Sequence, residues 1–258
     1  MLCNNHAHLC DRTPPEVLFA GTHNSMSSAE EEWIAPNHNW AIPQQLQDGI
    51  RALNIDTYWW EEEAYMCHSF CEIGAQPLSW ATDEIASFLS ENPNTVLIIT
   101  FQSTLSAEET LVPFVSSGLR DELYEHQINS PWPTLRELID TRKRLLVFSN
   151  SDGGEHDGYM AQWEHWVDTP YSANSPDDFG CFFDRGDPQT ASLYNINHFL
   201  TNPVALPNLA ETANQEDILH QHIERCIEES GRFPSQILVD FYRIGSVLPV
   251  VDFYNQEH

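Results

Sequence analysis

The stretch VLFAGTHNS, at residues 17–25, decides how this chain folds. An apolar run typical of a β-strand, residues 17–20, stops at Gly21. Thr22, His23, Asn24 and Ser25 follow. A plain turn needs glycine and asparagine, but it has no need of an imidazole. If other strands also end in histidine, carboxylate or amide side chains, these groups would meet at one end of a sheet.

Strand patterns recur along the chain and alternate with helical ones. Short apolar runs predict strands at residues 16–20, 51–58, 64–68, 95–101, 144–150, 192–199 and 236–242. Several are continuously hydrophobic, as expected for strands that are buried on both faces. Helical spacing of apolar residues predicts helices at residues 43–50, 79–92, 134–141 and 214–230, and Ser79 is the expected N-cap of the second.

This alternation predicts a parallel sheet. A single closed (β/α) barrel suits 258 residues, of which 41% are hydrophobic. The alternative is an open doubly wound sheet, but no glycine-rich phosphate-binding motif follows the first strand. No linker divides the chain, so we expect residues 1–258 to form one domain.

The charge balance excludes some partners. Asp and Glu number 39 against 11 Lys and Arg, which gives a formal net charge of −28. A nucleic-acid binder needs a basic surface, and strong attraction to an anionic membrane needs one too. We interpret the acidic residues as a solvated surface that keeps the protein soluble. No apolar run approaches the roughly 18 residues of a membrane span, and the stretch MLCNNHAHLC lacks the pattern of a signal peptide.

Six cysteines form two close pairs and one distant pair. Six cysteines can pair in many ways, and histidines near both close pairs leave zinc binding as an alternative. We favour disulfides, and therefore an exported, extracytoplasmic location. The expected pairs are Cys3–Cys10, Cys67–Cys71 and Cys181–Cys226.

Polar side chains stand at the ends of the predicted strands, where parallel α/β barrels carry their chemistry. They are His23 and Asn24 after the first strand, Asn54 and Asp56 on the second, His68 at the end of the third, Gln102 after the fourth and Asp240 on the last. Each alone has a structural explanation, such as capping the next helix. Together they favour a site. Two histidines, a carboxylate and nearby oxygen ligands suit phosphodiester cleavage by general acid–base catalysis.

Several motifs also resemble those of a known protein family. They are GTHNSMSS, QQLQDGIRALNIDTYWW, YMCHSF, ENPNTVLIITFQS, WPTLRELIDTRKRLLVFSN and FPSQILVDFY. In order, and from about Cys3 to Asp252, they resemble the phosphatidylinositol-specific phospholipase C X-domain family, in particular its secreted phospholipase C-like phosphodiesterase branch. The resemblance implies a distorted (β/α)8 TIM barrel and cleavage of phosphatidylinositol or a related glycerophosphodiester.

The resemblance also implies roles for individual residues. His23 matches the general base that deprotonates the inositol 2-hydroxyl, so that a cyclic phosphate forms and diacylglycerol leaves. His68 matches the general acid, and Asp240 matches the carboxylate that orients the base.

Asn24, Asn54, Asp56 and Gln102 match the positions of metal ligands in calcium-dependent members. The chain departs from that pattern, because such members carry acids where Asn54 and Gln102 stand. Metal-independent members place an arginine where this chain has Asp56. Oxygen ligands suit calcium, and magnesium less well, so we expect a weak site for Ca²⁺ rather than Mg²⁺.

Three further residues are weaker candidates for substrate contacts. Arg185 and His198 lie near late strand ends, from which they would reach the phosphate or the inositol. Trp59, just beyond Asp56, would contact a lipid or a ring.

Two other functions remain open. One is cleavage of a different phosphodiester headgroup, on a sphingolipid or a glycerophosphodiester; enzymes of the latter type usually begin with His-Arg, where this chain has His23-Asn24. The other is a catalytically silent barrel that binds a ligand. The retention of His23, His68 and Asp240 opposes it, because a binding module has no need of a proton relay. We expect a secreted monomer that touches a membrane surface only transiently.

Overall fold

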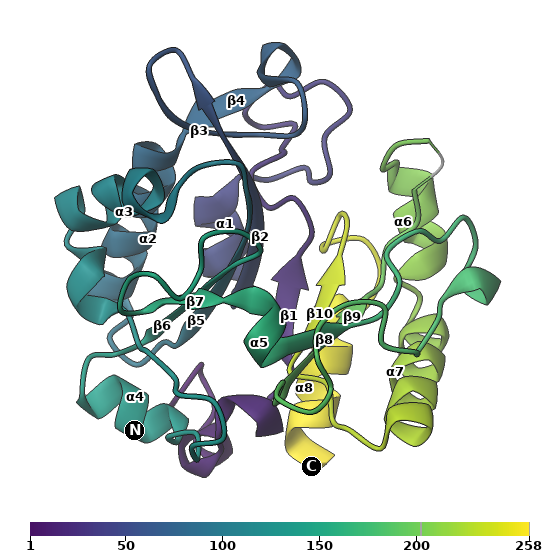
Figure 1. The fold of residues 1–258 in the computed structure, drawn as a ribbon. Helices are drawn as coiled ribbons and strands as arrows, with labels where there is room; N and C mark the ends of the chain where they lie inside the picture. Colours follow the sequence, from purple (N-terminus) through teal and green to yellow (C-terminus); the bar gives the residue numbers. More distant parts are fainter. Residues whose placement is uncertain (202, 258) are drawn as a thin grey trace.

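The computed structural model describes residues 1–201 and 203–257, and its centre is a sheet of parallel strands (Figure 1). The neighbours in this sheet run β7-β6-β5-β2-β1-β10-β9-β8, and every pairing along this path is parallel. The strands are β1 (Phe19–Thr22), β2 (Ala52–Trp60), β5 (Leu97–Ser103), β6 (Leu145–Ser149), β7 (Tyr159–Ala161), β8 (Trp166–Asp168), β9 (Leu193–Asn197) and β10 (Gln236–Val239).

The sheet curls into a distorted barrel. Its order follows the chain, except that β10 lies beside β1, so the last and first strands are neighbours. The two ends of the path, β7 and β8, are consecutive in the chain and are joined by α5 (Gln162–His165). No ladder joins β7 to β8 among the described residues, which leaves the barrel open at that point. The predicted single-domain barrel is therefore confirmed, in its distorted form.

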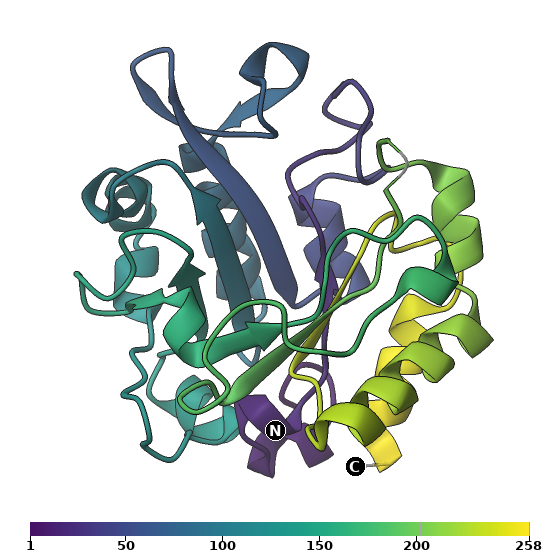
Figure 2. The same cartoon turned by 45° about the vertical axis from the view of Figure 1, so that its right-hand side comes forward.

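Helices pack around the outside of the sheet. Figures 1 and 2 show α2 and α3 on one flank and α7 and α8 on the other. The helices are α1 (Ile42–Asp48), α2 (Leu78–Glu91), α3 (Ala107–Ser116), α4 (Leu135–Asp140), α6 (Pro207–Ala213), α7 (Glu216–Ser230) and α8 (Val247–Glu257). None of the helices in the described part of the chain is long and apolar enough to cross a membrane.

A hairpin rises from one end of the barrel. The second half of β2 pairs antiparallel with β3 (Glu63–Cys67), and β3 pairs with β4 (Ala75–Pro77), as the top of Figure 1 shows. His68 is the first residue after β3. The hairpin therefore carries one predicted catalytic residue to the same end of the barrel as the carboxyl ends of the strands.

Local sequence accounts for most of these elements. All seven predicted strands are present, and β5 contains five buried residues in succession. A capping box begins α4, since Thr134 and Glu137 exchange side-chain and backbone hydrogen bonds. The expected cap of α2 is wrong. That helix begins at Leu78, directly after Pro77, whose φ of −55° already suits a helix start, so Ser79 lies inside the first turn.

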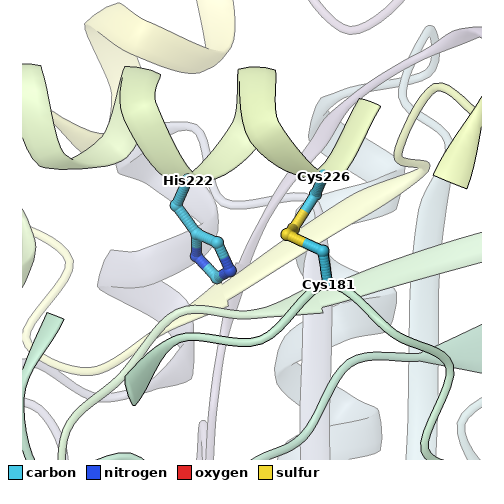
Figure 3. Close-up of side chains that lie close together, drawn as sticks. All are labelled: Cys181, His222 and Cys226. Atoms are coloured by element: carbon cyan, nitrogen blue, oxygen red, sulfur yellow. A yellow bond between two sulfur atoms is a disulfide. The ribbon is translucent and has the colours of Figure 1, made fainter. Parts of the chain in front are cut away.

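The three predicted disulfides are present: Cys3–Cys10, Cys67–Cys71 and Cys181–Cys226. Figure 3 shows the last of them beside His222, which precedes Cys226 by one turn of α7. The two sulfurs and a His222 nitrogen lie within 4.8 Å of one another. Because the sulfurs of all three pairs, including the two close pairs, are bonded to each other, they are not metal ligands, and the zinc alternative is wrong.

Candidate active site

His23 and Asp240 form a hydrogen-bonded pair across the first and last strands. In the ladder of β1 and β10, Thr22 lies opposite Val239, so the next residue on each strand faces the other. His23 Nδ1 donates to Asp240 Oδ1 at 3.1 Å. Asp240 is buried, whereas the edge of the His23 ring remains accessible.

Gly21 allows these two strands to lie this close. A Cβ atom there would lie 2.7 Å from Leu238 Cδ2 and 3.2 Å from the carbonyl oxygen of Ile237. Any larger residue would therefore push β1 away from β10 and lengthen the contact between His23 and Asp240.

His68 faces this pair from the hairpin. It lines one cavity together with His23, Asn24, Asp56 and Gln102. Burial lowers the pKa of the His68 imidazole, and the nearby His23 lowers it further. A lowered pKa makes protonated His68 a better proton donor to a leaving group.

Asp56 is a buried carboxylate that lines the same cavity. Burial raises its pKa to about 6, although the neighbouring His23 acts in the opposite direction. Among the described residues, no hydrogen bond or salt bridge involves the Asp56 side chain. Desolvation without a counter-charge is costly, so this carboxylate would be stabilised by a bound cation.

Of the other three predicted metal ligands, Asn24 and Gln102 line the same cavity as Asp56, whereas Asn54 lines the adjoining one. In the ladder of β2 and β5, Asp56 is opposite Gln102, which lines the cavity. Asn54 Oδ1 accepts a hydrogen bond from the Asn24 backbone N–H at 3.4 Å, and its amide nitrogen donates to Thr100 Oγ1 at 3.3 Å. One carboxylate and several amide oxygens fit a weakly held hard cation such as Ca²⁺.

A second, more polar cavity of about 160 Å³ adjoins the first, and His23, Gln102, Tyr171 and Phe199 line both. Its other lining side chains are mainly neutral amides: Asn54, Asn150, Gln162, Asn195, Asn197 and Gln236. The buried oxygens Asn195 Oδ1 and Gln236 Oε1 have no hydrogen-bond partner in the protein. Such a wall is suited to an uncharged, hydroxyl-rich ligand.

Arg185, one of the weaker candidates, does line this polar cavity. Its guanidinium binds both oxygens of the buried Asp168. The same guanidinium lies 4.6 Å from the ring centroid of Trp163 and 4.4 Å from that of Tyr171. The ion pair and the two rings therefore fix the position of Arg185 at the cavity wall.

His198 and Trp59 line neither cavity, so the structure does not bring them together with the other candidates. His198 is buried and its two ring nitrogens contact the Ala213 carbonyl oxygen and His222. Successive side chains of an extended chain point to opposite sides, so His198 points toward the helices because Asn197 points inward. Trp59, which is 55% exposed, lies beyond the barrel rim on the hairpin and faces Val112 of α3.

Sequence reasoning missed several residues that shape the site. Asn195 and Asn197 alternate within an otherwise apolar strand, a pattern that signals two polar groups facing inward. Asn37, by contrast, comes from a loop with no periodic pattern, yet its amide contacts Asp240. Trp163 lies in the short helix α5 and Asp168 is the last residue of β8, and neither element was predicted.

Comparison with known proteins agrees with this geometry. The model of the PI-PLC X family matches residues 9–255. A PI-PLC X domain-containing protein of Arthroderma benhamiae is 29% identical, over 96% of this chain and 87% of that protein. An uncharacterized secreted protein of the same fungus is 28% identical and a PI-PLC X domain-containing protein of Arabidopsis thaliana is 26% identical. This chain spans about 60% of the length of each of these two.

Solved structures show the same fold. The phosphatidylinositol-specific phospholipase C of Listeria monocytogenes superposes with a TM-score of 0.65, over 96% of this chain and 95% of that one, at 17% identity. A mutant of the corresponding Staphylococcus aureus enzyme gives a TM-score of 0.62 at 14% identity. The match of the family model along nearly the whole chain, on a barrel of this type, shows that the protein belongs to the PI-PLC X family.

Proposed function

We propose that this protein cleaves a phosphodiester by phospholipase C-type chemistry at the cavity between His23 and His68. The observation that carries the proposal is the hydrogen-bonded pair of His23 and Asp240, with His68 facing it across one cavity. The fold is of the phosphodiesterase type, and the arrangement supplies both a general base and a general acid.

The proposed reaction has one displacement at phosphorus. The Nδ1–H group of His23 donates to Asp240, which leaves Nε2 to accept the proton of a substrate hydroxyl. The hydroxyl oxygen then bonds to phosphorus, and the bond from phosphorus to the leaving oxygen breaks. Protonated His68 gives its proton to that leaving oxygen. The product is a cyclic phosphate, and the two histidines end in the opposite protonation states.

The substrate that fits best is a lipid with a polyol headgroup, such as phosphatidylinositol. The polar cavity offers neutral amides for hydroxyl groups, and the mouth of the other cavity is apolar. Ile34, Phe70 and Val204 at this mouth are 65%, 67% and 40% exposed. These side chains suit transient contact with a membrane surface, and the net charge of −28 favours a surface of mainly zwitterionic lipid.

We further propose that a divalent cation, Ca²⁺ rather than Mg²⁺, assists the reaction. Asp56 would hold it together with amide oxygens of Asn24, Asn54 and Gln102. The ion would supply the positive charge that stabilises the phosphate in the transition state. The Asp56 carboxylate cannot supply this charge by itself. The unpaired, buried state of the Asp56 carboxylate supports this assignment.

We propose a secreted location for the protein. Three disulfides support export to an oxidising compartment, and one relative is named a secreted protein.

Phosphorus NMR of the products tests the proposed reaction. The protein is incubated with phosphatidylinositol vesicles and, separately, with water-soluble phosphodiesters. We expect a cyclic inositol phosphate from the parent, none from His23→Ala, and an unchanged yield from His156→Ala, which alters an exposed histidine outside both cavities. Headgroup release without a cyclic species would favour a different phosphodiesterase, and no turnover of any substrate would favour the silent binding barrel.

A further inference from the structure

We infer that Asn37 is a positioning residue that holds the Asp240 carboxylate in the orientation in which it accepts from His23. The inference deepens the proposed function and rests on it for its catalytic meaning. The contact itself is a property of the fold.

The carboxylate of Asp240 receives two donors on the same oxygen. Asn37 Nδ2 donates to Asp240 Oδ1 at 2.9 Å, and His23 Nδ1 donates to that same atom at 3.1 Å. Both Asn37 and Asp240 are 4% exposed. The other oxygen, Asp240 Oδ2, is buried and has no hydrogen-bond partner in the protein. Rotation of the carboxylate away from His23 would therefore also break the contact with Asn37.

Backbone hydrogen bonds position the Asn37 side chain next to Asp240. Its N–H donates to the Ser27 carbonyl oxygen at 3.1 Å, and its own carbonyl oxygen accepts from the Phe241 N–H at 2.8 Å. Phe241, the residue after Asp240, has a φ of 46°, in the left-handed region that non-glycine residues rarely adopt. Asn37 thus holds a strained turn next to the carboxylate as well as the carboxylate itself.

The neighbouring His38 holds the other member of the pair. His38 Nε2 donates to the backbone carbonyl oxygen of His23 at 2.7 Å. Burial lowers the pKa of His38 to about 4, so its ring stays neutral near pH 7 and keeps this one donor. Two successive loop residues therefore fix the base and its carboxylate relative to each other.

Removal of the Asn37 donor should loosen the Asp240 carboxylate. Asn37 and His23 bind the same oxygen, and Asp240 Oδ2 has no hydrogen-bond partner in the protein, so the contact with His23 alone would then restrain the rotation of the carboxylate. A carboxylate that rotates more freely orients the His23 ring less well for proton transfer, which lowers kcat without weakening the binding of substrate.

The test combines NMR of the His23 Nδ1–H proton at one fixed pH with steady-state kinetics. In Asn37→Ala, we expect the signal of this proton to broaden or move upfield because its hydrogen bond to Asp240 is less well held, and a kcat lower by roughly ten- to hundredfold with KM unchanged. Asn37→Leu removes the donor at similar volume, so it gives the answer if the smaller side chain impairs folding. Asn39→Ala, an exposed asparagine two residues further on, is the matched control.

The NMR signal distinguishes this inference from the proposed function. If the parent cleaves no phosphodiester, the proposed function fails, but the His23 Nδ1–H signal still reports the influence of Asn37. A signal in both Asn37 variants identical to that of Asn39→Ala would overturn the inference. A rise in KM alone would also overturn it, because Asn37 lines the cavity and would then act by direct contact with substrate.

Discussion

Phe199 lies flat against His23: the two ring centroids are 3.8 Å apart and the ring planes differ by 4°. Phe199 is buried and follows β9, whereas His23 follows β1. The stacking therefore ties the imidazole to a strand other than the two that form the hydrogen-bonded pair. One face of the ring is covered, and a substrate can approach only along the ring edge or the opposite face.

Phe199→Leu should weaken this restraint while keeping an apolar neighbour. Stacked aromatic pairs contribute about 0.5–1.5 kcal/mol beyond the burial of their area, which corresponds to a kcat lower by roughly two- to tenfold. Steady-state kinetics on a water-soluble phosphodiester would measure the change. An unaltered kcat would show that the hydrogen bond to Asp240 is sufficient to orient His23.

His23→Ala and His68→Ala should each lower turnover by roughly 10²–10⁴-fold, as for the loss of a general base or a general acid. Asp240→Asn should cost less than His23→Ala, because Asp240 orients and stabilises the base without contacting the substrate. Circular dichroism would confirm that each variant is folded. Near-parental activity in either histidine variant would reject the mechanism, and a harmless Asp240→Asn would reject the role of the pair.

Removal of divalent cations should reduce activity, and calcium should restore it at about 10⁻⁴–10⁻³ M, because one carboxylate gives a weak site. Calorimetric titration with calcium would measure binding independently of turnover, and Asp56→Ala should lose both responses. Full activity in chelator would instead assign the positive charge to Arg185. Arg51 does not qualify, since its guanidinium is buried and donates to the carbonyl oxygens of Leu46 and Ile50.

Stability should fall as the pH is lowered from about 6.5 toward 4. Burial lowers the pKa of His38, His165 and His198 to about 4, and that of His222 to about 3, from 6.5. In this window the unfolded chain binds protons that the folded chain excludes, so the free energy of unfolding decreases. Asp56, whose pKa is raised to about 6, acts in the opposite direction below that pH.

Urea unfolding of the parent and of His165→Phe measures the contribution of one buried histidine. Both proteins lose the same carboxylate charges as the pH falls, so the difference between them reports the protonation of His165. His165 Nδ1 is buried without a partner, and the ring packs on Phe148. The variant should lose less stability than the parent between pH 7 and pH 5. Equal losses would mean that His165 is not a source of the acid sensitivity.

The disulfides should differ in their contribution to stability. Cys181–Cys226 closes a loop with a sequence separation of 45, and Cys3–Cys10 one of 7. The loss of loop-closure entropy in the unfolded chain predicts about 4 kcal/mol for the first and about 2 kcal/mol for the second. Urea unfolding of the two double-alanine variants would measure both values. A larger loss for Cys3–Cys10 would contradict the ranking.

The sequence by itself determined the long elements of the fold and the main candidates for the site. Strands such as β5 are visible because their hydrophobic residues are continuous, and His23 and Asp240 are visible because each directly follows a strand. Parallel strands bring their carboxyl ends together at one edge, so placement in the chain was enough to predict that these residues meet.

Only the tertiary structure decided the remaining parts. The strands β4, β7 and β8 have three residues each, too few to show a period, and they exist because longer neighbours pair with them. His198 and Asn197 are adjacent in sequence, yet only Asn197 reaches the cavity, because the side chains of an extended chain alternate. Asn37 reaches Asp240 through hydrogen bonds that join residues 203 positions apart, and no local pattern encodes a contact over such a separation.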